Sequence, residues 1–347
     1  MRNCRVFIYL LLLTLCSCKA ELRDLCYDHS HISNLQVGFD WQEVPEIHPK
    51  GMTVLFYDAK QDYQEPERYD FTGTEGGTAR LIAGSYRAVA YNYDTETILY
   101  RNGESVQTLE AYTRYSSVEE GTQLASFTRG QTMPRAAGTE NEPVILEPDE
   151  LCGAVSDEFT LSPSEGTQVA IKPQMRTKLM TITISNVSNL EYTSQLGGAL
   201  SGLSPSVNMA TGELGEGLVT ETFPCHAKDA TTLEMNFRVF GHCPEGHDQE
   251  HEQEQGHSES LHSHLLTIYA ILNDGSKWYY TTDITTKMHK EQPGTEPGTE
   301  PGSEPEDDEE ITVDVEGLPI PEPISDGNGG FQPTIDGWQS IEINVGM

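Results

Sequence analysis

Apolar and polar residues alternate along most of the chain, and few stretches have the spacing of an amphipathic helix. In residues 177–186, Met180, Ile182 and Ile184 alternate with polar residues. Because side chains two apart share one face of a strand, this pattern predicts a strand with one buried side. Residues 52–57 are apolar on both faces, which predicts a central strand. Further strands are expected at 35–41, 79–82, 86–93, 123–127, 144–146, 168–172, 218–223, 233–240, 265–272, 277–284 and 311–315.

Turn sequences join these expected strands. Asn273-Asp274-Gly275 predicts a tight hairpin between 265–272 and 277–284. A second hairpin is expected around 226–230, and a short helix near 190–200 within a Gly- and Ser-rich crossover. Many short strands at near-regular spacing are typical of β-sandwiches, so the sequence predicts an all-β protein.

The chain has 347 residues, which is enough for two domains of ordinary size. We expect a first β-sandwich at 18–148 and a second at 149–347. The second contains a His-rich loop at 241–263 and a Pro-, Gly- and Glu-rich stretch at 290–310. Such a stretch cannot bury a core, so it is expected to be a disordered linker.

Residues 1–17 have the build of a secretory signal. Arg2 and Arg5 precede an apolar run at 6–13, which is too short to span a bilayer as a mature helix. Ser17 stands just before Cys18, as in the pattern read by lipoprotein signal peptidase. Cys18 is therefore the expected lipid-attachment residue, and two or more acyl chains there would hold the protein firmly at a membrane.

Charge and cysteine content narrow the class of protein. With 21 Lys+Arg and 55 Asp+Glu, the formal net charge is −34, which excludes nucleic acid as a partner. Once the signal is removed and Cys18 is acylated, the remaining cysteines are Cys26, Cys152, Cys225 and Cys243. We expect free thiols, or at most a Cys26–Cys152 disulfide. No CxxC motif occurs that would indicate a zinc ribbon or a redox site.

No sequence motif of an enzyme is present, neither a nucleophile elbow nor a phosphate loop nor a dinucleotide fingerprint, so neither catalysis nor a cofactor is expected. The His-rich stretch is the one candidate for metal chemistry, because neutral imidazoles suit zinc, nickel or copper. Its candidate ligands, beside Cys243, are His242, His247, His251, His257, His262 and His264. The alternative is a polar surface insertion that binds metal loosely.

Two further groups of residues have open interpretations. The aromatic residues Trp41, Trp278, Tyr279, Tyr280 and Trp338 could stack on a glycan, although such residues more often fill a sandwich core.

The C-terminal segment alternates Ile341, Ile343 and Val345 with polar residues. It is expected to complete its own sheet, or alternatively to donate a strand to the open edge of a partner.

Several runs resemble one family. They are residues 24–29, 37–41, 51–57, 69–73, 84–87, 91–96, 330–333 and 336–338. In these runs the chain resembles the fimbrillin-like lipoproteins of Bacteroidetes. The resemblance implies two tandem transthyretin-like β-sandwiches and a role as a subunit or anchor of surface fimbriae.

One departure from this family bears on that role. Stalk subunits of the family are matured by an arginine-directed protease that cuts after the first strand, but here the loop between Trp41 and Met52 has Lys50 and no arginine. We therefore expect an uncleaved fimbrial anchor or accessory subunit at the outer membrane, tethered by acylated Cys18 and paired with other fimbrial subunits. The alternative is a surface lipoprotein that binds glycan or metal ions.

Overall fold

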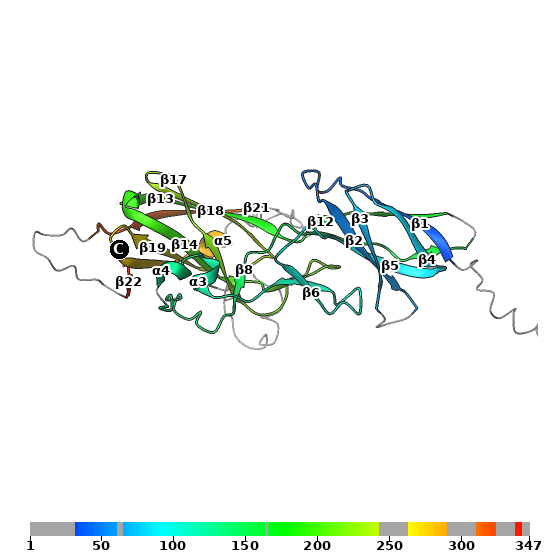
Figure 1. The fold of residues 1–347 in the computed structure, drawn as a ribbon, viewed down its shortest axis with the longest axis horizontal. Coiled ribbons are helices and arrows are strands. Elements are labelled where there is room, and N and C mark those ends of the chain that lie inside the picture. The colour runs from blue at the N-terminus through cyan, green and yellow to red at the C-terminus, as the bar shows by residue number, and fades with distance from the viewer. Residues whose placement is uncertain are drawn as a thin grey trace, which may run out of the picture.

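The computed structural model describes residues 32–60, 65–128, 130–163, 166–242, 263–289, 310–323 and 337–341. Figure 1 shows an elongated molecule with sheets at both ends, and nearly all of its regular structure is β-strand. The all-β sandwich fold predicted from the sequence is confirmed. In these ranges no helix has the length and apolar character needed to cross a membrane.

The first sandwich consists of two sheets at the N-terminal end. The smaller sheet contains, in order, β11 (Thr167–Ile171), β1 (Ile32–Phe39) and β4 (Gly77–Ile82). The larger contains β12 (Gln174–Met175), β9 (Cys152–Val155), β5 (Gly84–Asn92), β2 (Gly51–Asp58) and β3 (Glu67–Thr72), with β10 (Phe159–Leu161) also paired to β5. Leu35 and Val37 of one sheet share a core with Val54 and Phe56 of the other. As predicted, β2 is a central strand and is buried at all but its last residue.

The second sandwich is larger. One sheet contains β17 (His226–Asp229), β18 (Thr232–Val239), β13 (Lys178–Ser188) and β21 (Glu310–Pro319). The facing sheet contains β22 (Trp338–Ser340), β20 (Lys277–Asp283), β19 (Leu265–Leu272), β14 (Thr193–Leu203), β16 (Val219–Pro224) and β8 (Val144–Leu146). Met180, Ile182 and Ile184 are fully buried between the sheets, as their alternation predicted. The predicted hairpin of β19 and β20 is also confirmed, and Gly275 takes a positive φ of 82° in its turn.

A third sheet joins the two sandwiches. It contains β15 (Ser206–Asn208), β7 (Glu110–Thr113) and β6 (Ile98–Arg101). Its apolar residues share one buried cluster with Leu55 and Val89 of the first sandwich and with Phe240, which follows β18 in the second. Because this cluster contains residues of both sandwiches, burial of apolar surface stabilises their attachment.

Strand pairing crosses the domain boundary that we predicted at 148/149. β8 lies before that boundary but pairs in parallel with β16 of the second sandwich, where Ile145 is buried in the core. β9 to β12 lie after it but belong to the first sandwich. The polar Glu147-Pro148-Asp149-Glu150 stretch is therefore a crossing between sandwiches and does not separate two independent units.

Residues 193–203 form a strand, so the predicted helix near 190–200 is wrong. After a short 3-10 turn, η2 (Leu190–Tyr192), β14 runs for 11 residues between β16 and β19. Its glycines allow close packing, because a Cβ on Gly198 would lie 2.3 Å from the ring of Phe223 and a Cβ on Gly197 would lie 2.8 Å from Thr122. The glycine content that suggested a crossover reflects this packing.

Two other local predictions are also wrong. Residues 123–127 form no strand, because Gln123 has a positive φ of 61° between two short helices, α3 (Val118–Gly121) and α4 (Ala125–Thr128). The strand at 219–224 does not pair with 232–239. After Pro224 the chain crosses to the facing sheet, and the hairpin consists of β17 and β18.

Among the described residues, one acidic side chain is buried in the second sandwich. Glu221 is 1% exposed and lies two residues from both Val219 and Phe223, which are core residues of the same strand. Its Oε1 has no hydrogen-bond partner in the part of the chain that the structure describes. Burial, and secondarily the charge of Glu147, raises the pKa of Glu221 well above its ordinary value.

We expect Glu221→Gln to change how stability depends on pH. An unfolded chain releases the Glu221 proton near its ordinary pKa, whereas the folded chain retains it, so wild-type stability falls as pH rises above about 4.3. Glutamine has the same size and does not ionise. Relative to wild type, the variant should therefore be more stable at pH 8 than at pH 4. Urea unfolding at both pH values measures this gain, and an equal difference between the proteins at both values would contradict it.

Candidate metal centre

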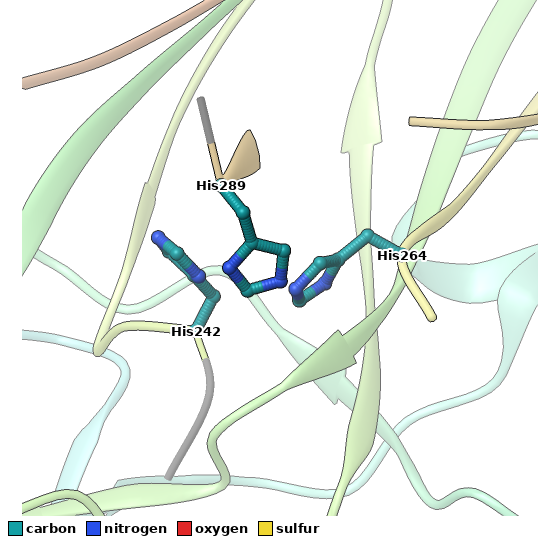
Figure 2. A group of neighbouring side chains, drawn as sticks. All are labelled: His242, His264 and His289. Atoms are coloured by element: carbon teal, nitrogen blue, oxygen red, sulfur yellow. The ribbon is translucent and has the colours of Figure 1, made fainter. Parts of the chain in front are cut away.

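Three histidines meet at one end of the second sandwich. His242, His264 and His289 come from three different segments, and one ligand nitrogen of each lies within 4.8 Å of the others. Their ring centroids are 5.2–5.4 Å apart. Figure 2 shows the three imidazoles close together, with His289 between His242 and His264 in this view. We call this group the histidine triad.

His242 is positioned by the end of β18. It forms a β-bridge with Leu203 of β14, and the preceding Gly241 accepts a 3.0 Å hydrogen bond from the backbone N–H of Ser204. These contacts fix His242 between the two sheets. Its side chain is half-buried, and its Nδ1 atom is buried without a hydrogen-bond partner among the described residues.

His264 lies just before β19 and is fully buried. Its Nδ1 lies 3.3 Å from the backbone oxygen of Ser201. The neighbouring Gly202, with φ of +81°, makes room for the ring, because a Cβ there would lie 2.8 Å from His264 Nδ1. Gly202 lies where the register of β14 shifts, and β-bulges of this kind often direct a side chain at a functional site.

His289 follows the one-turn helix α5 (Thr285–Met288) and is half-buried. Two hydrogen bonds join the start of this helix to the backbone of His264. The backbone N–H of His264 donates to Thr285 Oγ1 at 2.8 Å, and the backbone N–H of Ile284 donates to the oxygen of His264 at 2.9 Å. One helical turn then places His289 beside the His264 ring.

The charges around the triad favour neutral imidazoles. Burial first of all, and then the positive charges of His264, His289 and Lys178, lower the pKa of His242 to about 4. Asp283 lies nearby, and hydrogen bonds from Thr285 lower the pKa of its carboxyl group. The unprotonated imidazole is the form that binds a transition metal.

The sequence predicted only part of this triad. Of the predicted ligands, His242 and His264 lie close together, whereas His247, His251, His257 and His262 lie outside the described residues. His289 was missed, because it is far along the chain from the His-rich stretch. The available signal was its position directly before the second insertion, since both insertions begin next to a triad histidine.

The tryptophans considered for a glycan site pack against the cores. Trp41 contacts the first core and donates a 2.9 Å hydrogen bond to the oxygen of Thr74. Trp278 packs against the second core, and the Trp338 ring meets Tyr269 edge-on at 5.5 Å. These contacts favour the structural interpretation of the tryptophans over a sugar-stacking platform.

The beginning of the C-terminal segment lies in its own sheet. β22 pairs in parallel with β20, and the backbone N–H of Ile341 donates to Tyr279 at 2.8 Å. Ile343 and Val345 lie outside the described residues. The two described cysteines, Cys152 and Cys225, are buried free thiols. Cys18, Cys26 and Cys243 lie outside the description, as does 290–309 of the Pro- and Gly-rich stretch.

An open groove of about 440 Å³ lies at the crossing between the sandwiches. Its carboxylates already have partners. Asp149 accepts bonds of 2.5 and 2.6 Å from the backbone of Glu96 and Thr97, and Glu150 forms an ion pair with Arg238. These acidic side chains therefore hold the crossing in place, which gives them a structural role.

Comparison with known proteins identifies a matching family model and similar proteins. The family model described as "Domain of unknown function (DUF5119)" matches residues 17–224. A Bacteroides ovatus protein with the provisional name fimbrium anchoring subunit Fim4B is 28% identical over 371 residues, covering 99% of this chain and 100% of that protein. This end-to-end match is consistent with the resemblance to fimbrillin-like proteins.

A solved structure shares the fold. A crystal structure from Bacteroides ovatus, provisionally described as an adhesin, has a TM-score of 0.53 and 25% identity and covers 83% of this chain and 94% of that one. The fimbrial anchor protein Mfa2 of Porphyromonas gingivalis is more distant, with a TM-score of 0.40 and 12% identity over 74% of this chain and 84% of its own. The resemblance to fimbrillin-like proteins is confirmed at the level of sequence relationship and β-sandwich fold.

Proposed function

The chain belongs to the DUF5119 family, and we propose that it is a fimbrial anchoring or accessory subunit of the cell envelope. The observation that supports this most strongly is the end-to-end similarity to a fimbrium anchoring subunit. The relatives reported above are named as structural or adhesive proteins and not as enzymes. We propose a structural role for this chain too, with anchoring and subunit contact as its mechanism.

In this proposal Cys18 carries the lipid that holds the protein at the outer membrane. The first described strand, β1, begins at Ile32, so a short segment links the acylated residue to the first sandwich. Two acyl chains bury enough methylene groups for stable anchoring, whereas one chain gives only reversible binding. The −34 net charge favours a water-exposed position away from anionic headgroups.

We further propose that the chain acts without cleavage after β1. The connection after Trp41 contains no arginine, and its end is bonded to the rest of the first sandwich. Lys50 donates its backbone N–H to Asp94 at 2.9 Å and accepts a 2.8 Å bond from Gly73. β1 itself is central in its sheet, between β11 and β4. Removing it would expose two strand edges, so an intact sandwich suits an anchor.

Contact with another subunit would then use the edges of the sheets. Within the described ranges β21 is a terminal strand, paired only with β13. Its outward residues Glu310, Asp314 and Glu316 are exposed acids. Charged side chains on an edge strand prevent indiscriminate pairing, so a partner there needs complementary positive charge.

Immunogold labelling of fimbriated cells tests this proposal, with antibodies against the second sandwich. An anchor is expected to be labelled at the cell-proximal base of each fimbria, with the mature chain uncut in immunoblots. Labelling along the whole fimbrial length, together with a chain cut after β1, would identify a stalk subunit and overturn the proposal. Fimbriae from a strain lacking the gene provide the matched control for antibody specificity.

A further inference from the structure

The histidine triad joins the two sheets of the second sandwich at one end. His242 ends the β18 segment of one sheet, whereas His264 precedes β19 of the other. His289 follows α5, whose Lys287 donates a hydrogen bond to the backbone of Asp314 in β21. A ligand shared by these three side chains would therefore cross-link segments that are otherwise connected through the 243–262 insertion and through the β19–β20 hairpin.

The hydrogen bond of His264 identifies which of its ring nitrogens carries the proton. A carbonyl oxygen can only accept, so Nδ1 carries the proton in the bond to Ser201 and Nε2 of the neutral ring keeps a lone pair. A histidine that donates one ring N–H to a backbone carbonyl is the usual arrangement of a metal ligand. This bond orients the ring before any metal binds.

His242 supplies the second observation. A buried polar atom without a partner costs about 1–3 kcal/mol, so such atoms call for an explanation. Its Nδ1 is buried and lacks a partner in the described part of the chain, within a group whose ligand atoms already lie close together. A metal ion bonded to this nitrogen would remove the cost.

We propose that His242, His264 and His289 bind one divalent transition-metal ion, zinc in the first instance, which ties the two sheets of the second sandwich together. In a tetrahedral zinc site with bonds of 2.0–2.1 Å, the ligand nitrogens are about 3.3 Å apart. The triad nitrogens lie within 4.8 Å, so small rotations of the half-buried His242 and His289 complete the site. Three histidines leave a fourth position for water or another ligand.

The site is a structural one in this proposal. The ion holds the two ends of the 243–262 insertion together, because those residues lie between two triad members, and it lies beside the start of the 290–309 stretch. Cross-linking long loops restricts the unfolded chain and so stabilises the folded one. The positive charge of Lys178 disfavours a bound cation. The ionised carboxylate of Asp283 near His264 partly compensates for that charge.

Calorimetric titration of the purified mature protein with zinc chloride, after removal of metal by a chelator, tests the proposal. We expect one zinc per triad and a rise of several degrees in the unfolding midpoint when zinc is in excess. His289→Gln replaces a proposed ligand that is half-buried at a helix end, and it is expected to weaken zinc binding by more than about 100-fold. This loss is larger than the loss expected when a residue that only orients a metal ligand is removed. His226→Gln, an exposed histidine on β17, is the matched control and should bind as wild type does.

A second variant separates the triad from the His-rich insertion. Replacing His247, His251, His257 and His262 by alanine together should leave the high-affinity zinc and the midpoint shift intact. The wild-type protein loaded with cobalt(II) should also show the visible absorption of a nitrogen-ligated, four-coordinate ion, which reports the site without any substitution. The proposal is overturned if wild-type protein binds no zinc, if His289→Gln binds it as tightly as wild type, or if only the insertion variant loses it.

Discussion

Phe237→Ala is expected to lower the free energy of unfolding by about 3–5 kcal/mol, because it removes a fully buried aromatic side chain. Phe237 lies on β18, opposite Met180 of β13, and is 0% exposed. Its ring stacks on Phe223 of the facing sheet, with centroids 3.8 Å apart and planes 10° from parallel. The change therefore leaves a cavity and removes the aromatic contact that joins the two sheets of the second sandwich.

Urea or guanidinium unfolding of the purified protein measures this loss. Asn236→Ala is the matched control, since Asn236 precedes Phe237 on the same strand and points outward. Its side chain makes exposed hydrogen bonds with Thr181 and Glu234, so a change of roughly 0.5 kcal/mol is expected. Similar losses for the two variants would contradict the assignment of Phe237 to the core between the sheets.

Cys18→Ala is expected to remove the protein from the outer membrane. Each methylene buried in the bilayer contributes about 0.8 kcal/mol, so losing two acyl chains should reduce outer-membrane retention more than about tenfold. The variant should also fail to incorporate labelled palmitate. Total membrane sedimentation is the wrong readout, because an uncut chain keeps the apolar run at 6–13 and can remain in the inner membrane. Separated outer-membrane fractions are needed.

Cys16→Ala is the matched control for Cys18. It changes a neighbouring cysteine that is preceded by Leu15, a bulky residue at the position where the signal peptidase needs a small one. This variant should keep both the palmitate label and the outer-membrane location. If the label followed Cys16, or if Cys18→Ala stayed in the outer-membrane fraction, the proposed lipid site would be wrong.

Strands with regular alternation were predictable from the sequence. β13 and the β19–β20 hairpin are confirmed because burial on one face repeats every second residue, and because Gly275 occupies the turn position that needs a positive φ. Burial of β2 on both faces was visible in its unbroken apolar run. In these cases the local pattern and the tertiary environment agree.

β14 could not be predicted from its local sequence. Its glycines and serines have low intrinsic strand preference, and only Phe223 and Thr122, which are close in space, explain why small residues are needed. The domain boundary predicted at residues 147–150 is wrong for a similar reason. A polar Pro-containing stretch resembles a linker, and nothing in it indicates that the chain exchanges strands between sandwiches.

The histidine triad was half predictable. A run rich in histidine indicated His242 and His264, but composition gives no means of selecting a distant His289. That choice depends on α5, which is held against His264 by Thr285 and Ile284. Tertiary contacts, and not sequence density, decide which histidines converge.

The most direct test of the anchoring role is the fraction of fimbrial protein that stays cell-bound in a strain whose only copy of this protein carries Cys18→Ala. Fimbriae retained on cells and fimbriae shed into the medium are quantified by immunoblot, beside wild-type and Cys16→Ala strains. Anchoring through Cys18 predicts that fimbriae assemble but are shed with the variant protein, while both comparison strains retain them. A wild-type level of cell-bound fimbriae, with the variant absent from the outer membrane, would contradict the proposed function.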